Sequence, residues 1–530
     1  MLIKTLKYLT LRGLRATILV VSIFPLGGIR GAYAQIGQPW IHDPSTLAEC
    51  DGKWYTFGTG GGGLVTDDGW SWHSGPVRPG GGAAPDVLKI GNRYLVAYSA
   101  TGGGLGGGHS GRVLTMWNET LDPASPKFKY TEPIEVAYSD SDEDNDAIDA
   151  GLLLDPTTGR LWLTYGTYFG NIRIVELDPK TGARVDGNQP KDVAIDCEAT
   201  DLIYRDGYYY LLGTHGTCCD GVNSTYNIVC GRSKNVLGPY LDNMGRDMLQ
   251  GGGKMVISGE RRAVGAGHFG RTVLDEGVEV MSFHWEADLD RSGRSVLAIR
   301  PLIWKNGWPV AGESLYNEVA NHQRPVPDTY NLVSERHGYS LELSVDFVRM
   351  EQERQMWHRV NPNEQTKPLP QQTLDDMRQS FEDGAKAWAA YSKEKGLAEG
   401  TIGVRIGDYM GRPHQDWTIM PMPEAGGYLS SPYYTITITG TNLALTATKD
   451  LEVVASPQKW SLKEGESQSV DASLWRIEQL TDGTYRIMPK VIPGKEGVNK
   501  TYCLYSIGDS TPILAPYDFS SDNSKWNLKK

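Results

Sequence analysis

The feature that most constrains this chain is a short unit that recurs through about its first 300 residues. Each copy opens on a glycine, continues with aromatic residues alternating with aliphatic ones, and ends near glycine, serine or threonine. The copies begin at Gly52, Gly91, Gly159, Gly207 and Gly277, at intervals of 39, 68, 48 and 70 residues. Such alternation is typical of strands opened by a tight turn, and its repetition is typical of radial architectures. We therefore predict an all-β fold in which residues 35–312 form a five-bladed β-propeller; a β-sandwich is the structural alternative.

A second, different repeat follows residues 313–328, a proline-containing segment that we expect to be a linker. Three segments open with a strand-like run and close with tryptophan followed two residues later by isoleucine or leucine. The openings begin at Thr329, Tyr433 and Thr484, and the closing tryptophans are Trp417, Trp475 and Trp526. The pattern resembles a ricin-type β-trefoil, so residues 329–530 are expected to form a β-trefoil-like domain.

An insertion at about residues 351–399 interrupts the first trefoil segment. Met377, Phe381, Ala385 and Trp388 follow one another at helical spacing, which predicts a helix whose apolar side packs against the domain. We interpret this helix as packing rather than as a functional element.

The first 34 residues have the pattern of a secretory signal. Basic residues precede an apolar stretch from Ala16 to Leu26, and residues 32–34 have the small-x-small pattern of a cleavage site. The apolar run is broken by Pro25 and is short for a membrane span. We expect an exported protein, periplasmic or secreted, that begins near Gln35 and has no membrane span after removal of the signal.

Composition narrows the classes of partner. The net charge of −12 disfavours nucleic acid and is compatible with a neutral substrate. Trp and Tyr, with 15 and 27 copies, outnumber the 9 Phe, which suits stacking on sugar rings, although filling of a β-core is the simpler reading. The six cysteines are too sparse for a disulfide scaffold and lack zinc-site spacing, and Cys218 and Cys219 are left open as free thiols or partners of other cysteines. We expect a monomer.

Three carboxylates lie in similar places relative to the repeated unit. Asp43 lies in "IHDPS", Asp149 in "DAIDAGLLLD" and Glu198 in "IDCEATDLIYRDG", each a short distance before a strand. Because the innermost strands of a propeller line its channel, the same position in different blades can bring side chains together. Glycosidic hydrolysis takes two carboxyl groups whose environments separate their pKa values. For any one of the three, a turn or strand-end role is the simpler explanation, but their shared placement favours a common site.

The most specific stretch is "CCDGVNSTYNIVCGRSKNVLGPYLD", from Cys218 to Asp242. Its paired cysteines, "STYNI" run and "GRSK" turn resemble glycoside hydrolase family 43, and within it the endo-arabinanases. "GAGHFG" around His268 and "IRPLIW" from Ile299 resemble the closing blade of that family. The resemblance extends over roughly Pro39 to Pro309, and it implies an enzyme that cleaves α-1,5-linked L-arabinan or a related arabinofuranose polysaccharide with inversion.

The resemblance also implies roles for individual residues. Asp43 corresponds to the general base, Glu198 to the general acid, and Asp149 to the carboxylate that raises the pKa of the acid. Inversion implies that the base and acid carboxyl groups lie about 6.5–9.5 Å apart. His268 corresponds to a channel histidine beside a calcium or other ion, held mostly through water, and a hydrogen-bonded histidine without an ion is the alternative. No organic cofactor is expected.

Substrate contacts are expected from Asp86, Asp146, Ile148, Gly166 and Thr167. The sequence departs from the family pattern at two places, because Ala84 stands where a tryptophan is frequent and Asp146 where an asparagine is usual. Both changes leave linkage and endo or exo action open. The glycine-rich stretches "GTGGGGLV", "RPGGGAAP" and "GGGLGGGHSG" lack the lysine of a phosphate loop and are expected to be loops at the rim of the cleft.

Three alternatives remain from the sequence. The same propeller could belong to an exo-acting α-L-arabinofuranosidase or β-xylosidase, which would release only monosaccharide. A non-catalytic carbohydrate-binding protein is the second alternative, against which the retention of all three carboxylates argues. The third alternative concerns the acidic run from Ser139 to Asp146. We expect a solvated loop there, and a second calcium site is the alternative. The trefoil is expected either to hold polysaccharide or to brace the propeller.

Overall fold

The structure is a computed structural model that describes most of the chain. The described residues are 36–75, 81–100, 110–140, 145–260, 262–315, 328–344, 371–409, 411, 413–429, 431–458, 470–507 and 511–530. The predicted signal at residues 1–34, most of the predicted linker and the first part of the insertion lie outside them. No helix of the described ranges is both long enough and apolar enough to cross a membrane.

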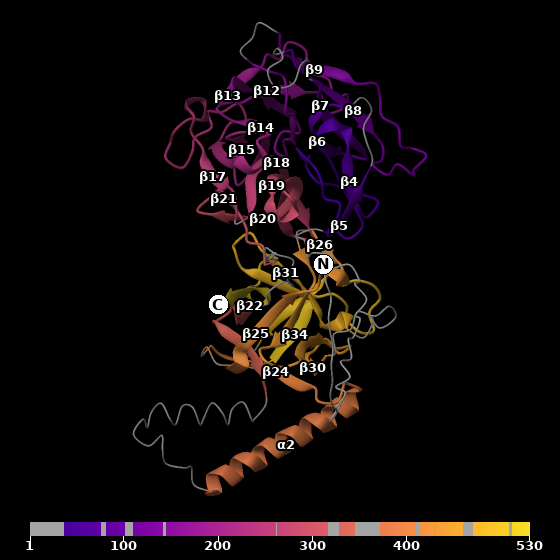
Figure 1. The fold of residues 1–530 in the computed structure, drawn as a ribbon, viewed down its shortest axis with the longest axis vertical. Helices are drawn as coiled ribbons and strands as arrows, with labels where there is room; N and C mark the ends of the chain where they lie inside the picture. The colour runs from indigo at the N-terminus through magenta and orange to yellow at the C-terminus, as the bar shows by residue number, and fades with distance from the viewer. Residues whose placement is uncertain are drawn as a thin grey trace, which may run out of the picture. The chain divides into compact units, whose positions relative to one another are not determined.

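Within the described residues, the chain up to Ala311 forms five antiparallel sheets that follow one another in sequence order (Figure 1). Their strands are β2 to β5 (Ala48–Cys50, Lys53–Phe57, Gly63–Thr66, Ser71–Ser74), β6 to β9 (Ala83–Ile90, Arg93–Ala100, Arg112–Asn118, Ile134–Tyr138), β10 to β13 (Gly151–Leu154, Leu161–Gly166, Asn171–Leu177, Lys191–Ile195), β14 to β17 (Glu198–Arg205, Tyr208–His215, Asn227–Ser233, Lys254–Ile257) and β18 to β21 (Ala263–Asp275, Val278–Asp288, Arg294–Lys305, Trp308–Ala311). β1 (Ile36–Gly37) joins the first sheet by parallel pairing with β5. The predicted five-bladed propeller is confirmed.

The repeated unit marks the same place in each blade. Each of its five opening glycines lies in the turn between the first and second strands, with φ between +61° and +93°. Residues with a side chain rarely adopt such angles, so glycine is the natural choice there. The apolar residues that follow pack between neighbouring blades, since separate apolar clusters join the blades pairwise around the ring and close it between the fifth and the first.

The C-terminal region has its own closed sheet. In the described part of residues 328–530, six strands form a ring by antiparallel pairing, namely β22 (Asp328–Ser334), β25 (Asp416–Pro421), β28 (Tyr434–Ile438), β31 (Leu474–Gln479), β32 (Tyr485–Pro489) and β35 (Trp526–Lys529). Hairpins connect them, namely β23–β24 (Tyr339–Leu343, Ile402–Asp408), β29–β30 (Leu443–Ala447, Val453–Pro457) and β33–β34 (Tyr502–Ile507, Thr511–Pro516). A small hairpin, β26–β27 (Gly427–Tyr428, Ser431–Pro432), lies between β25 and β28.

The closing tryptophans of the second repeat explain its threefold pattern. Trp417, Trp475 and Trp526 are each fully buried. Their indole Nε1 atoms donate hydrogen bonds of 2.9, 2.8 and 2.9 Å to backbone oxygens at equivalent places of the three hairpins. A buried indole needs such a partner for its N–H group. The three tryptophans of the sequence repeat therefore occupy equivalent places in the C-terminal region.

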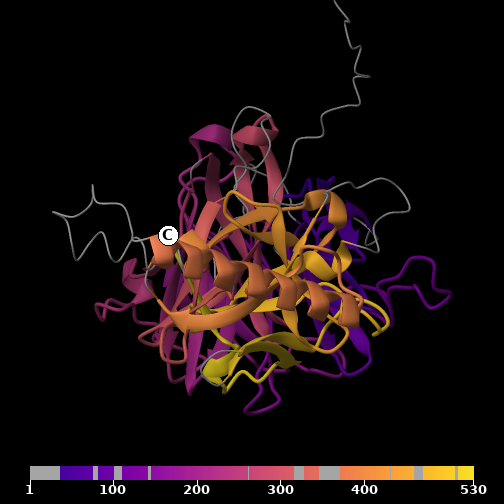
Figure 2. The same cartoon turned by 90° about the horizontal axis from the view of Figure 1, so that it is seen from below.

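The insertion contains α2 (Gln371–Lys395), which extends beyond the strands of the C-terminal region (Figures 1 and 2). The expectation of one packed stripe is wrong for its middle, because Ala385 is exposed. Contacts are made by its final turns, where the half-buried Trp388 lies against Gly403 and Lys395 pairs with Asp450 at 2.9 Å. Helical spacing predicts an apolar face but not how much of that face has a partner. The side chains of Met377 and Phe381 are outside the described residues.

Short 3-10 turns complete the described elements: η1 (Thr59–Gly61), η2 (Gly221–Asn223), η3 (Met248–Gln250), η4 (Leu289–Arg291), η6 (Pro413–Gln415), η7 (Pro423–Ala425), η9 (Asp471–Ser473) and η10 (Asp522–Ser524).

Side-chain contacts join the C-terminal region to the fifth blade. The buried Arg476 pairs with Asp275 at 2.7 Å and with Glu276 at 3.1 Å. Arg486 donates a 2.6 Å hydrogen bond to the backbone oxygen of Glu276.

Candidate active site

One position of each blade supplies a residue with an unusual backbone. Asp43, Ala84, Asp149, Ala199 and His268 lie just before or within the innermost strands, with φ of 53°, 44°, 59°, 48° and 58°. Such angles cost a residue with a side chain about 1–2 kcal/mol. In the blades of Ala84, Ala199 and His268 the strand pairing also shifts register at this point. Bulges and strained residues of this kind re-aim side chains and concentrate at functional sites.

The three predicted carboxylates lie in one buried cluster. Asp149 and Glu198 are each 8% exposed, and the side chain of Asp43 is 17% exposed. The backbone N–H of Ala199, next to Glu198, donates a 3.0 Å hydrogen bond to Asp149 Oδ2. The charge of Asp43 acts on both other carboxylates, as their pKa shifts show. Blades one, three and four thus bring together the residues that the sequence analysis grouped.

Glu198 has the environment of a protonated acid. Burial raises its pKa, a hydrogen bond from the Tyr226 hydroxyl lowers it, the charge of Asp43 raises it further, and the result is about 7. Burial and then the charge of Glu198 raise the pKa of Asp149 well above its usual range. Two carboxyl groups so close cannot both ionise readily. A proton is therefore retained between Asp149 and Glu198 near neutral pH.

Asp43 has the opposite environment. Burial would raise its pKa, but the charge and hydrogen bond of His42 outweigh that effect and hold the pKa below its usual range. Its Oδ2 atom accepts a 2.5 Å hydrogen bond from Thr59 Oγ1 and lies 2.8 Å from His42 Nδ1. Among the described residues, the ion-pairing neighbours of its Oδ1 atom are farther away, namely His268 Nδ1 at 3.6 Å and His284 Nδ1 at 4.0 Å. Asp43 is therefore ionised, with one oxygen held and the other directed toward His268.

His268 is nearly buried, at 5% exposed, and its backbone N–H donates a 2.9 Å hydrogen bond to Thr214 Oγ1. Its Nδ1 atom has no hydrogen-bond partner among the described residues. Burial lowers its pKa to about 4, so the imidazole is neutral and able to act as a ligand. A neutral imidazole beside the carboxylate of Asp43 fits a cation held largely through water, although Ca²⁺ prefers oxygen ligands.

Four of the expected substrate residues lie near Asp149. The backbone N–H of Gly166 donates a 2.8 Å hydrogen bond to the oxygen of Ile148, and Thr167 follows, 3% exposed. Gly166 has φ of 138°, and a Cβ there would lie 2.2 Å from the oxygen of Asn171. The half-buried Asp146 accepts a 3.2 Å hydrogen bond from Ser139 Oγ. Asp146 thus has a protein partner in the acidic stretch, residues 141–144 of which lie outside the described residues.

Asp86 does not have the environment expected of a substrate contact. It is 2% exposed, its Oδ1 atom accepts the N–H of Thr46 at 3.1 Å, and its Oδ2 atom accepts the N–H of Leu152 at 3.0 Å. Arg271 Nη1 lies 2.8 Å from Asp86 and 3.6 Å from Asp201. Both oxygens of Asp86 therefore have protein partners, and its buried pair with Arg271 joins blades two and five.

This network predicts a large loss of stability when its cation is removed. Arg271→Met leaves Asp86 and Asp201 buried without a counter-charge, so we expect the free energy of unfolding to fall by about 3–5 kcal/mol. Denaturant unfolding of parent and variant measures the difference. Arg112→Met is the matched control, since its 2.7 Å pair with Glu135 is half exposed, and it should cost at most about 1 kcal/mol. Equal losses in the two variants would contradict the role of Arg271.

The site contains side chains that the sequence analysis did not single out, namely His42, Thr59, Tyr226, His284 and Glu286. Two signals in the sequence could have identified some of these residues. His42 adjoins Asp43, and residues two apart on a strand, such as His284 and Glu286, share a face. The structure also answers the open question about the paired cysteines, because Cys218 and Cys219 form a disulfide with each other.

Comparison with known proteins bears on the propeller. The model of the glycosyl hydrolases family 43 matches residues 59–309. An extracellular exo-α-(1→5)-L-arabinofuranosidase, ArbA of Cellvibrio japonicus, is 30% identical over 52% of this chain and 86% of its own length. An extracellular endo-α-(1→5)-L-arabinanase of Bacillus subtilis is 31% identical over 51% of this chain and 87% of its own. The solved exo-1,5-α-L-arabinanase from a bovine ruminal metagenomic library is 32% identical, with a TM-score of 0.48, over 53% of this chain and 99% of its own.

Proposed function

This chain belongs to family 43 of the glycosyl hydrolases, and on that basis we propose that it cleaves α-1,5-linked L-arabinan or a related arabinofuranose polysaccharide. The observation that carries the proposal is the opposite displacement of two pKa values in one cluster. The pKa of Glu198 is raised to about 7, while that of Asp43 is held below its usual range. Such a separation is what an acid and a base working together on one bond require.

The proposed reaction is a single displacement. Glu198 donates its proton to the glycosidic oxygen as the bond from that oxygen to the anomeric carbon breaks. Asp43 removes a proton from a water molecule, whose oxygen forms the new bond at the opposite face of the same carbon. The configuration is thereby inverted. Asp149 has the role of modulating the acid, because two neighbouring carboxyl groups cannot both ionise readily and the pair therefore retains a proton near neutral pH.

Debranched arabinan tests the proposal and the mode of cleavage. Product sizes followed over time should include medium-length oligomers early if action is endo, and only arabinose or a short product of one size if it is exo. Relatives of both kinds are similar to this chain to the same degree, which keeps the exo-acting arabinofuranosidase as the second candidate. NMR of the first product should show the inverted anomer. Absence of any cleavage of arabinan and of aryl arabinofuranosides would exclude the proposal.

The proposed place of action is outside the cytoplasm, either the periplasm or the medium. The two named relatives are extracellular proteins, which supports export. The C-terminal region has two candidate roles there. It could hold polysaccharide near the propeller and raise its effective concentration. The contacts of Arg476 with Asp275 and Glu276 support the other role, that of a brace.

The pKa of Glu198 sets an expected pH dependence. Because the acid must be protonated, kcat should fall as the pH rises through about 7. The hydrogen bond from Tyr226 lowers this pKa, so Tyr226→Phe should move the basic limb of the kcat profile to higher pH. We expect kcat at the optimum to stay within about tenfold of the parent value. A limb that stays in place, or moves to lower pH, would contradict the assignment of the limb to Glu198.

We also propose that His268 contributes to a site for a hydrated Ca²⁺, which would supply positive charge beside Asp43. Ca²⁺ added to EDTA-treated protein should then raise its melting temperature, because a hundredfold excess over Kd stabilises by about 2.7 kcal/mol. Differential scanning calorimetry of parent and His268→Ala measures the effect, which should be absent in the variant. Equal shifts in both proteins would place the ion elsewhere, and no shift in the parent would mean no calcium site.

A further inference from the structure

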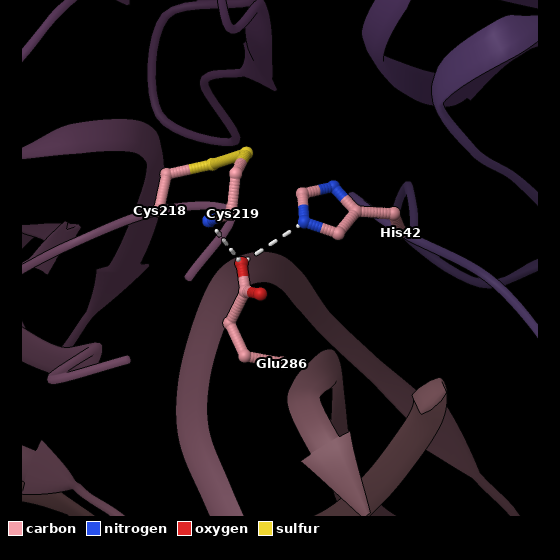
Figure 3. A group of neighbouring side chains, drawn as sticks. All are labelled: His42, Cys218, Cys219 and Glu286. Atoms are coloured by element: carbon pink, nitrogen blue, oxygen red, sulfur yellow. Dashed lines mark hydrogen bonds and ion pairs between the residues drawn. A yellow bond between two sulfur atoms is a disulfide. The ribbon is translucent and has the colours of Figure 1, made fainter. Parts of the chain in front are cut away.

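We propose that Glu286 is a positioning residue for Asp43, acting through His42, and that the turn closed by the Cys218–Cys219 disulfide holds Glu286 in place. The inference rests on the proposed role of Asp43 as general base. Figure 3 shows the arrangement, in which the carboxylate of Glu286 lies between the ring of His42 and the backbone nitrogen of Cys219.

The imidazole of His42 bridges two carboxylates. Its Nε2 atom lies 3.0 Å from Glu286 Oε1, and its Nδ1 atom lies 2.8 Å from Asp43 Oδ2. Both nitrogens can donate only when the ring is protonated. Burial alone would lower the pKa of His42, but the hydrogen bonds and charges of Asp43 and Glu286 raise it to about 10. His42 therefore acts as a fixed double donor between the two carboxylates.

His284 provides a second connection between the same two residues. Its Nδ1 atom accepts a 3.2 Å hydrogen bond from the backbone N–H of Asp43, and its Nε2 atom lies 3.5 Å from Glu286 Oε1. The side chain of His284 is fully buried and that of Glu286 is 3% exposed. Glu286 thus faces both imidazoles that contact Asp43, one at the side chain and one at the backbone.

This arrangement suits a base that must be held in an unfavourable conformation. Asp43 has φ of 53°, which its surroundings must stabilise. His42 and Thr59 occupy Oδ2 and leave Oδ1 to receive a proton from water. A buried carboxylate such as Glu286 is costly unless it is paired. Its closest partners lead to the base or to the disulfide turn, which indicates a role in the site rather than in the apolar core.

The disulfide turn supplies the remaining contact of Glu286. The backbone N–H of Cys219 donates a 3.1 Å hydrogen bond to Oε1, the same oxygen that pairs with His42. The turn is closed further on by Ser224 Oγ, which donates a 2.7 Å hydrogen bond to the oxygen of Thr217. All six cysteines are among the described residues, and the other four are free and buried, so a reductant has one disulfide to act on. Breaking it frees the Cys218–Cys219 peptide to turn its N–H away from Glu286.

Glu286→Gln tests the relay in the intact chain. The amide keeps the size of the side chain but removes its charge, so we expect kcat on arabinan to fall about 10–100-fold, as misplacement of a catalytic group does, with KM within about twofold. Glu279→Gln is the matched control on the same strand, β19, where the carboxylate contacts Arg205 and lies 2.8 Å from Trp304 Nε1. That variant should keep the parent kcat. A parent-like kcat for Glu286→Gln would overturn the proposal.

Azide rescue separates positioning from a general structural effect. In Asp43→Ala, azide can attack the anomeric carbon while Glu198 protonates the departing oxygen, so no base is needed. The Asp43→Ala background has no base to position. Because Glu286 and Asp43 act as one unit, adding Glu286→Gln to it should change the azide-dependent rate on an aryl arabinofuranoside less than about twofold. A further 10-fold loss in that background would mean that Glu286 supports the fold generally. If the Glu286→Gln protein is insoluble, the His42→Asn variant is measured in its place, because the amide of the introduced asparagine can still donate a hydrogen bond to Asp43.

Reduction tests the outer part of the relay. Dithiothreitol converts the disulfide to two thiols and is itself oxidised to a cyclic disulfide. We expect the reduced protein to lose kcat severalfold with unchanged KM, and the double variant Cys218→Ser/Cys219→Ser to show the same loss without responding to reductant. Two free thiols by mass spectrometry together with a parent-like kcat would overturn the role of the disulfide.

Failure of this inference is distinguishable from failure of the proposed function. If Asp43→Asn is as active as the parent, the base itself is misassigned. If Asp43→Asn is inactive while Glu286→Gln has parental kcat, only the positioning inference is wrong.

Discussion

Glu198→Gln should lower kcat on linear arabinan by about 10³-fold, within the range expected for loss of a general acid. The amide is nearly the size of the carboxyl group and can still accept the hydrogen bond of Tyr226, but it has no acidic proton to give to the leaving oxygen. Binding should persist, so the dissociation constant for an arabino-oligosaccharide, measured by isothermal titration calorimetry, should stay within about tenfold of the parent value.

The leaving group supplies the control for this prediction. An aryl arabinofuranoside with an acidic phenol needs little protonation as it departs, so Glu198→Gln should hydrolyse it with a much smaller loss than it shows on arabinan. Hydrolysis of arabinan at the parent rate would remove Glu198 from the role of acid. An equal loss on both substrates would indicate that the substitution disturbs the site as a whole.

Asp43→Asn should be as inactive as Glu198→Gln on arabinan, with a loss of about 10³-fold or more. The amide keeps the contact with Thr59 but cannot take a proton from water. Water activation is needed whatever the leaving group is, so the loss should be similar on arabinan and on the activated aryl substrate. Initial rates on both substrates, measured with the parent in parallel, check this expectation.

The two variants together form a stricter test than either alone. Separate acid and base roles predict two different patterns. The loss of kcat in Glu198→Gln should depend on the leaving group, and the loss in Asp43→Asn should not. If both variants behave alike on the activated substrate, the division of roles is wrong even though the site is right. Circular dichroism spectra should match the parent, because neither change alters the packing of the blades.

The repeated unit made the propeller predictable from sequence. Strand alternation and turn glycines act locally, and a residue at the start of each innermost strand occupies the same place in every blade. The positions of Asp43, Asp149 and Glu198 in a common cluster followed from that regularity. The three tryptophans of the C-terminal repeat were equally informative, because each indole donates a hydrogen bond to an equivalent hairpin oxygen.

Other features of the fold and the site could not be predicted from the sequence. Asp86 has the sequence context expected of a sugar contact, yet Arg271, 185 residues away, occupies its carboxylate. Ala385 follows helical spacing, but nothing covers the middle of α2 at that residue. Cys218 and Cys219 form a disulfide with each other, and their being neighbours in the sequence does not predict that bond.

What the sequence determined by itself is the architecture and the identity of three carboxylates, because repetition and hydrophobic alternation are properties of the chain read in order. The tertiary structure alone decided which carboxylate keeps its proton and which stays ionised. That difference comes from burial and from charges brought together across the blades. His42 holds the pKa of Asp43 down, whereas burial and the charge of Asp43 raise the pKa of Glu198. Electrostatic effects of this kind depend on distance in space, which the order of residues does not contain.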